Sequence, residues 1–129
     1  EKDAALARRF QLVKLDERVF KYARFIARLT GVDGAVVTSE GLEIIGFGAI
    51  IQGAMEMGGT VAKALDPEGS RREVEKVESV GTRHRSLYYL CNTLHDVLGI
   101  IVSQDAKARV VTYRSDMVTC WDVIPIDFA

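Results

Sequence analysis

The chain has 129 residues and a formal net charge of −1, with 48% hydrophobic and 27% charged residues. These values fit one globular domain with one core, and they give the chain no general attraction for nucleic acid or anionic membranes. Neither is expected as a partner, and any bound anion must be held by a local cluster of basic groups.

The start of the chain has no signal-peptide pattern, and no apolar run is long enough to span a bilayer. Residue 1 is Glu rather than Met, so we expect a piece of a longer protein, to which an effector domain can be fused. Cys91 and Cys120 lack metal-binding spacing and are expected to be reduced, buried thiols of a cytoplasmic protein. A disulfide between them stays open as the alternative.

Residues 1–30 are predicted to be a helical lead-in made of two helices. Apolar residues recur at helical spacing on either side of Asp16. Asp16 is the expected N-cap of the second helix, because its carboxylate can accept hydrogen bonds from the free N–H groups there. Gly31 suits the position just after the helix end.

From residue 35 the pattern becomes that of strands. Residues 35–38 are rich in β-branched side chains, Ser39-Glu40-Gly41 is a turn signal, and residues 42–51 form a second predicted strand. The short connection predicts an antiparallel pair. Gly46 and Gly48 indicate a bulge or a close backbone approach in the second strand. They are not a dinucleotide fingerprint, because the third glycine and the following helix are missing.

Residues 53–80 are the least determined part of the sequence. Several glycines and the Asp66-Pro67-Glu68-Gly69 turn interrupt this segment, and residues 70–79 are highly charged. We expect a surface excursion here, with little regular structure.

A helix is predicted over residues 83–95, where Leu87, Leu90, Cys91 and Leu94 fall at helical spacing. Strands are expected at 99–103, 109–113 and 117–124. The predicted fold class is therefore α/β, a mixed central β-sheet flanked by helices.

The tract Gly81-Thr82-Arg83-His84-Arg85-Ser86 opens this predicted helix. Helix starts carry unpaired N–H groups and a partial positive charge, so basic side chains oppose the local electrostatics. Such a conflict is typical of functional sites. A bound polyanion removes it, because phosphate oxygens accept from the N–H groups and from guanidinium forks. Gly81 permits a close approach, and Thr82 can cap the helix or donate to phosphate.

An exposed basic turn paired with the acids of residues 68–78 explains the same tract, and charge alone does not separate the two interpretations. Arg109 and Arg114 could add to an anion site, although strand surfaces commonly carry such residues. Tyr88 and Tyr89 could approach a nucleobase, but on a helix one is expected to be half-buried and the other exposed. His95, near the helix end, is expected to cap it.

Asp33-Gly34-Ala35 lies between a predicted helix end and a predicted buried strand. A carboxylate here could bind a metal or orient a sugar hydroxyl, and the two small residues leave room for a ligand. Taken alone, the motif is explained more simply as a polar loop that leads into a strand.

In their order along the chain, these features resemble the diadenylate cyclase (DAC) domain family, as found in DNA-integrity-scanning diadenylate cyclases. The resemblance rests on Asp-Gly-Ala at a strand start, a glycine-marked second strand and Gly-Thr-Arg-His-Arg at a helix start. The tract Gly99-Ile100-Ile101-Val102-Ser103-Gln104 is similar to the family's next strand. The similarity extends from about Arg24 to Tyr113, and Gly-Thr-Arg-His-Arg is its most specific part.

The resemblance implies that residues 1–129 form a single DAC-like nucleotide-binding domain. Such an enzyme is a nucleotidyltransferase that condenses two ATP molecules into cyclic di-AMP and releases pyrophosphate, with Mg²⁺ or Mn²⁺. By this resemblance Asp33 holds the metal and helps to activate the attacking 3′-hydroxyl, while Gly34 and Ala35 line the nucleotide pocket.

The resemblance also implies the contacts to the triphosphate. Arg83, His84 and Arg85 would be catalytic groups that cradle the phosphates. The positions expected to bind the nucleotide beside them are Gly81, Thr82, Ser86 and Ser103. Because the product is two-fold symmetric, a catalytic form is expected to be a face-to-face homodimer or a larger homo-oligomer.

Two other functions stay open. Sensor domains of the same fold bind a nucleotide second messenger, such as a cyclic dinucleotide, without catalysis. The Ser103-Gln104-Asp105 stretch and the strands of Arg109 and Trp121 resemble those sensors equally well. An interaction module whose basic turn docks an acidic protein surface is the other possibility, and it needs neither a metal nor Asp33.

Overall fold

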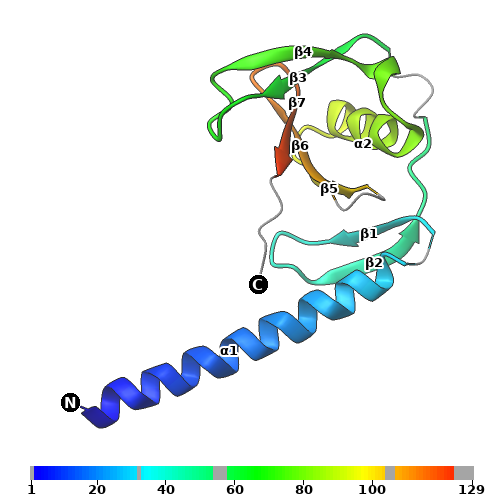
Figure 1. Cartoon of the computed structure of the whole chain (residues 1–129). Helices are drawn as coiled ribbons and strands as arrows, with labels where there is room; N and C mark the ends of the chain where they lie inside the picture. The colour runs from blue at the N-terminus through cyan, green and yellow to red at the C-terminus, as the bar shows by residue number, and fades with distance from the viewer. Residues whose placement is uncertain (1, 32, 54–57, 104–106, 124–129) are drawn as a thin grey trace. The chain divides into compact units, whose positions relative to one another are not determined.

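The computed structural model describes residues 2–31, 33–53, 58–103 and 107–123. The chain divides into two compact units, Glu1–Ile50 and Ile51–Ala129. The first contains helix α1 and the strand pair β1–β2, and the second contains helix α2 and the remaining strands (Figure 1). The described chain is a mixed α/β protein, as predicted, and none of its described helices is long and apolar enough to cross a membrane.

Helix α1 is one continuous helix, Lys2–Leu29. The prediction of two helices with an N-cap at Asp16 is wrong, because Asp16 lies inside α1. The segment contains neither Gly nor Pro, so nothing interrupts its backbone hydrogen bonds, and the cap preference of one aspartate is too weak to break them. The helix ends just before Gly31, as predicted, and the N–H of Gly31 donates to the carbonyl of Arg28 at 3.2 Å, but Gly31 lacks the positive φ of a left-handed glycine cap.

Strands β1 (Ala35–Thr38) and β2 (Ile44–Ala49) form the predicted antiparallel pair, with β2 shorter than expected. The pairing shifts between Ala35/Val37 and Val37/Thr38, so the predicted irregularity is present. Gly34, with φ +108°, lies against β2, where an added Cβ would be 2.6 Å from the carbonyl carbon of Gly48. The Tyr22 hydroxyl of α1 donates to the carbonyl of Leu42 in the turn between these strands.

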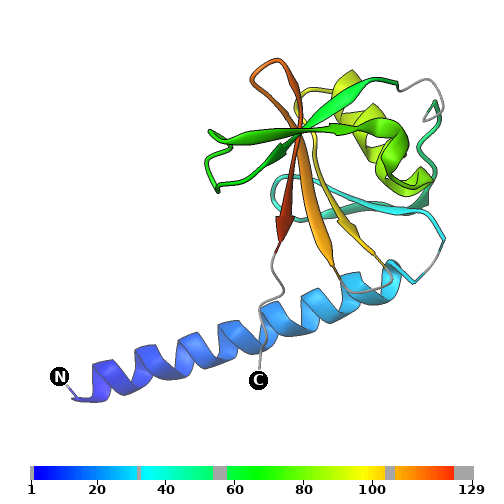
Figure 2. The same cartoon turned by 45° about the horizontal axis from the view of Figure 1, so that its top comes forward.

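The second unit is built on a five-stranded mixed sheet with the order β4-β3-β7-β6-β5. Neighbouring strands are antiparallel except for β3 and β7, which are parallel (Figure 2). The strands are β3 (Thr60–Ala64), β4 (Arg72–Lys76), β5 (Leu98–Val102), β6 (Ala108–Arg114) and β7 (Met117–Val123).

The prediction of a surface excursion over residues 53–80 is wrong, because β3 and β4 both lie there. Strand β3 is an inner strand of the sheet, with Val61 0% and Ala62 3% exposed. Its short apolar pattern is made mostly of small side chains, and its burial comes from strands distant in sequence. The predicted Asp66–Gly69 turn is confirmed as the β3–β4 connection, in which Asp66 accepts hydrogen bonds from the N–H groups of Ser70 and Arg71 at 2.7 and 3.1 Å.

Helix α2 (Thr82–Thr93) packs on the sheet and confirms the predicted helix, although it ends before His95. His95 lies 3.0 Å from the carbonyl oxygen of Asn92 and stacks on Tyr113, which fits the capping role expected for it. Both cysteines are free and buried, and burial raises the pKa of Cys91 to about 11. The buried core consists of Val61, Val77, Leu87, Tyr88, Cys91, Val111, Val118 and Cys120.

Candidate functional site

The start of α2 is built around Gly81, the N-cap residue, whose backbone is extended (φ −73°, ψ 171°). The first helical hydrogen bond runs from the N–H of Arg85 to the carbonyl of Gly81 at 3.1 Å. The N–H groups of Thr82, Arg83 and His84 precede this bond and therefore have no acceptor inside the helix. Within the described chain, no side chain caps this end and no acid lies in its first turn.

Thr82 is the first residue of α2 and not its cap, so the alternative in which its hydroxyl caps the helix is wrong. Gly81 takes the cap position instead, in an extended conformation that any residue can adopt, and the helix begins one residue earlier than a Thr82 cap would place it. The carbonyl of Thr82 accepts a hydrogen bond from the Ser86 hydroxyl at 2.9 Å. Ser86 thus bonds one turn back along its own helix.

Arg83 is exposed, and His84 and Arg85 are half-buried. Among the described residues, neither Arg83 nor Arg85 forms an ion pair with an acid of residues 68–78. Nε of Arg85 is buried without a hydrogen-bond partner in the described part of the chain. A buried donor without an acceptor is costly, so Arg85 carries an unmet hydrogen-bonding demand beside this turn.

His84 is turned towards the body of the second unit. Its ring meets the ring of Tyr88 edge-on, with centroids 6.4 Å apart. Burial lowers the pKa of His84, and the nearby positive charge of Arg109 lowers it further. His84 is therefore mainly neutral at pH 7 in the absence of a ligand.

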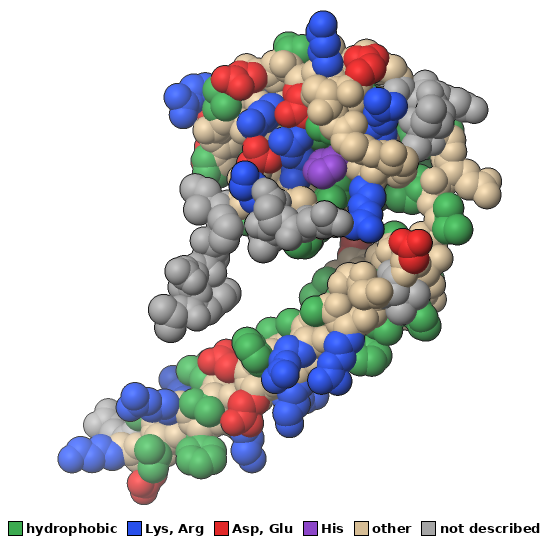
Figure 3. Space-filling model, turned by 45° about the vertical axis from the view of Figure 1, so that its right-hand side comes forward, with side chains coloured by type: hydrophobic (Ala, Val, Ile, Leu, Met, Phe, Trp, Pro, Cys, Tyr) green, Lys and Arg blue, Asp and Glu red, His purple; other side chains and the backbone are tan. Residues whose placement is uncertain are grey.

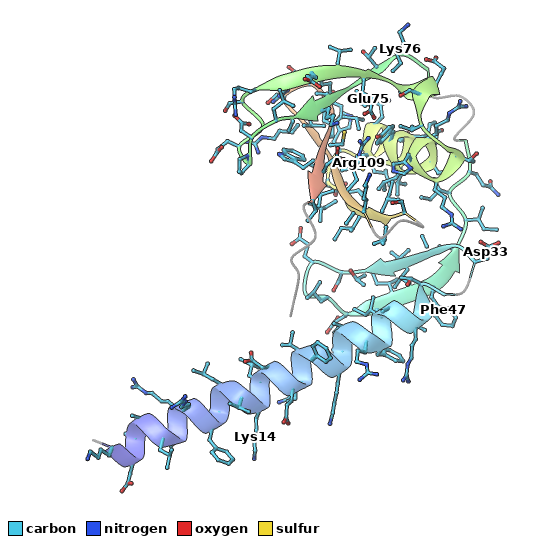
Figure 4. All side chains as sticks on the ribbon, viewed as in Figure 1. Lys14, Asp33, Phe47, Glu75, Lys76 and Arg109 are labelled. Atoms are coloured by element: carbon cyan, nitrogen blue, oxygen red, sulfur yellow. The ribbon has the colours of Figure 1, made fainter. Side chains whose placement is uncertain are left out.

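A second cluster, which the sequence did not reveal, lies beside His84. We call it the Arg109 cluster, and its members are Lys63, Glu75, Tyr88, Arg109 and Asp122. Nη1 of Arg109 donates to Glu75 Oε1 and to the Tyr88 hydroxyl, both at 2.6 Å, and its Nε donates to Asp122 Oδ1 at 2.7 Å. Lys63 Nζ lies 3.2 Å from the other oxygen of Asp122. Glu75 and Arg109 come from β4 and β6 and point toward each other (Figure 4).

The charges of the Arg109 cluster balance, with two cationic and two anionic side chains. Although burial works against the charged form, the bonds to Asp122, Glu75 and Tyr88 raise the pKa of Arg109. Burial also disfavours the charged form of Asp122, but the bonds from Arg109 and Lys63 lower its pKa. Arg109 therefore stays charged, and its charge is balanced by the two carboxylates inside the fold. The suggestion that it adds to the anion site is not supported.

Tyr88 connects the Arg109 cluster to the basic turn. It is fully buried, where a half-buried or exposed side chain was expected, and its hydroxyl accepts from Arg109 and donates to Glu75 at 3.1 Å. One helical turn earlier, the His84 ring lies edge-on to the Tyr88 ring. The cluster therefore anchors the start of α2 on β4, β6 and β7. The available sequence signal was that Arg109 lies two residues before the buried Val111, and Asp122 two residues after the buried Cys120, which places both charges on the core face of their strands.

The Asp33-Gly34-Ala35 motif belongs to the first unit. Asp33 is exposed just before β1, and Ala35 is half-buried as its first residue. The glycine at position 34 is explained by the structure without a ligand, because its backbone approaches Gly48 closely. The described residues contain no group of three or more His, Cys, Asp or Glu side chains that could hold a metal. Asp33 therefore offers one carboxylate, which fits Mg²⁺ when phosphate and water complete its ligand shell.

Ser103 closes the β5–β6 connection, where its N–H and its hydroxyl both donate to the carbonyl of Lys107, at 2.8 and 3.0 Å. Gln104 and Asp105, which contribute to the resemblance to DAC domains and related sensors, lie outside the described residues. A cavity of about 420 Å³ in the second unit is lined by Tyr89 and Asn92 of α2 together with Gly58, Thr60 and residues 116–118. None of the predicted phosphate-binding residues lines it.

Lysine and arginine side chains are interspersed with acids on the face of the second unit seen in Figure 3.

The chain matches no protein-family model, no curated protein and no solved structure. The start of α2 has free N–H groups and basic side chains, which are groups that can donate hydrogen bonds to an anion.

Proposed function

We propose that this chain is an adenine-nucleotide-binding domain of the DAC type, with a DAC-like fold, and that it condenses two ATP molecules into cyclic di-AMP. One observation carries the proposal: α2 begins with an uncapped, acid-free turn that bears Arg83 without an ion-pair partner among the described residues. The anion is proposed to be ATP, because the motifs occur in the same order as in DAC domains.

A triphosphate suits this turn better than a single anionic side chain does. The N–H groups of Thr82, Arg83 and His84 can each donate to a phosphate oxygen, and the guanidinium of Arg83 can donate two parallel bonds. Several negative charges near the helix start would also offset the repulsion between Arg83, Arg85 and the helix dipole. Bound phosphates would thus reduce an electrostatic repulsion that is present in the protein without a ligand.

In the proposed reaction, the 3′-hydroxyl oxygen of each ATP bonds to the α-phosphorus of the other, and each α-phosphorus loses pyrophosphate. Arg83 and Arg85 would neutralise the charge that develops on the α-phosphate and the leaving pyrophosphate. Asp33 is the proposed ligand of Mg²⁺ or Mn²⁺, which would supply further positive charge to the phosphates when bound. Because both ATP molecules react in the same way, the active form is proposed to be a two-fold symmetric homodimer.

The proposal is tested with the purified chain, ATP and Mn²⁺, by chromatographic detection of cyclic di-AMP and by calorimetric measurement of ATP binding. Arg83→Ala should weaken ATP binding about ten-fold or more, because it removes a charged hydrogen-bond donor. Asp33→Asn should abolish product while it preserves the fold. Lys76→Ala is the control, since the Lys76 side chain is also basic and exposed but lies at the end of β4.

Product that depends on both Asp33 and Arg83 supports the cyclase. ATP or cyclic dinucleotide binding that requires Arg83 without any product contradicts catalysis and leaves a sensor of the same fold. Failure to bind either nucleotide contradicts the whole proposal and favours the interaction module.

A further inference from the structure

Helix α1 exposes many apolar side chains, and one row of them is covered only in part by the described structure. None of its 28 residues is buried. Leu12, Leu15 and Val19 are 60%, 54% and 61% exposed, and Tyr22 is 37% exposed. A helix with such a stripe gains stability when the stripe is covered by a partner.

The spacing of this row is that of a coiled coil. Alternate steps of three and four residues connect Leu12, Leu15, Val19, Tyr22, Ile26 and Leu29. This repeat of 3.5 residues places the six side chains at consecutive a and d positions of a heptad, with Leu12 at a. We call these six residues the α1 seam. Lys14, Lys21 and Arg28 occupy the c positions, which face away from a coiled-coil partner. Figure 3 shows apolar and basic side chains along α1.

We propose that the α1 seam pairs with the same seam of a second copy of this chain, as a parallel two-stranded coiled coil. The residue types favour this occupant and this orientation. Two of the three a positions, Val19 and Ile26, are β-branched, and two of the three d positions, Leu15 and Leu29, are leucine. β-Branched residues at a with leucine at d favour parallel dimers.

The charges beside the seam are compatible with parallel pairing. In a parallel pair, a g residue of one helix faces the e residue five positions later in the other. Gln11 then faces Asp16, and Arg18 faces Ala23, so these flanking positions bring no like charges together. At the preceding d position, two copies of Arg8 would meet, and the seam therefore begins at Leu12.

The paired region is short, so we expect a reversible dimer. Ile26 and Leu29 are already half-buried in the single chain, and the Tyr22 hydroxyl is hydrogen-bonded to Leu42. The most accessible part of the seam thus extends from Leu12 to Tyr22. This inference does not depend on nucleotide binding, although a cyclase of the proposed kind also requires a second copy.

The first test compares two aspartates on α1 by sedimentation equilibrium of the full chain. Leu15→Asp places two like charges face to face at a d position and should raise the dimer dissociation constant at least ten-fold. Val13→Asp is the matched control, because Val13 is 53% exposed but occupies a b position outside the seam. Equal effects of the two substitutions, or a wild-type chain that stays monomeric at every concentration, would overturn the proposal.

The second test determines the orientation. Leu12→Cys and Val19→Cys, made separately, should both form disulfide-linked dimers under mild oxidation, because in a parallel pair each a residue meets its own copy. An antiparallel pair permits at most one of the two crosslinks, so a single crosslink or none would overturn the proposal. Wild type should not crosslink, since its own thiols are buried. Monomeric protein that binds anionic vesicles through Leu15 would identify a membrane surface as the occupant instead and would also overturn it.

Discussion

Arg109 of β6 donates a hydrogen bond of 2.6 Å to the hydroxyl of Tyr88 on α2, and Tyr88 in turn donates to Glu75 of β4. This pair of bonds connects the sheet to the helix that begins with the basic turn. The position of that turn therefore depends on a group that carries no phosphate-binding role of its own.

Removal of the Tyr88 hydroxyl should weaken this connection without creating a cavity. Tyr88→Phe leaves Arg109 bonded to both carboxylates, so we expect a loss of about 1–2 kcal/mol in the free energy of unfolding, measured in urea. Tyr89→Phe is the control, because the Tyr89 side chain is half-buried beside the 420 Å³ cavity. A neutral result for Tyr88→Phe would mean that the hydroxyl does not stabilise the fold.

Removal of the guanidinium itself should cost more. Arg109→Met leaves the carboxylates of Glu75 and Asp122 without their main partner, and the arginine side chain is only 13% exposed. We expect a loss of about 2–4 kcal/mol in the free energy of unfolding. Lys63→Met, which removes the more exposed cation of the same cluster, should cost less than about 1 kcal/mol. Equal losses for the two variants would contradict the central role of Arg109.

The stability of the protein should depend on pH through His84. Burial, followed by the charge of Arg109, lowers its pKa in the folded state below the ordinary value. The unfolded chain therefore binds a proton more readily, and the stabilisation present above about pH 6.5 is lost as the pH falls through the unfolded and then the folded pKa. His84→Gln should reduce the difference in urea midpoint between pH 8 and pH 5, relative to wild type and to His95→Gln. An unchanged difference would contradict the prediction.

Nucleotide binding should act on His84 in the opposite direction. Phosphate oxygens near the ring favour its charged form, so the pKa of His84 should rise when ATP binds at the start of α2. The measurement is an NMR titration of the ring protons with and without ATP. If the pKa of His84 stays the same while ATP binds, the nucleotide lies elsewhere.

Gly34 should be needed for folding of the first unit, whatever its role towards a ligand. Gly34→Ala combines a φ of +108° with a Cβ only 2.6 Å from the backbone of Gly48, so we expect a loss of about 1–3 kcal/mol. Gly46→Ala is the control, because an added Cβ there meets nothing within 4 Å among the described residues. Thermal unfolding of both variants in the absence of nucleotide tests this. Unchanged stability of Gly34→Ala would contradict this prediction.

Features that arise from neighbours in sequence were predicted well. The antiparallel pair β1–β2, the turn at Asp66–Gly69 and helix α2 each carry their own turn residues or apolar spacing. Strand β3 was missed because its burial depends on β7, which pairs with it from about 57 residues later in the chain. Strand β4 was missed because it is an edge strand that contains charged residues and no buried one. The Arg109 cluster was missed because its members come from four strands and a helix that are distant in sequence. In α1, one favourable cap residue was given more weight than an uninterrupted run of helix-compatible residues.

The position of β7 between β3 and β6 has a consequence for how this protein forms. The β3–β4 hairpin and the β5–β6 hairpin share no strand contact, and β7 alone joins them into one sheet. During synthesis the two hairpins emerge before β7, so each exposes an unpaired edge until the final described strand arrives. A chain that stops near residue 115 should therefore aggregate, and the folding of the second unit should not be completed until β7 has been synthesised.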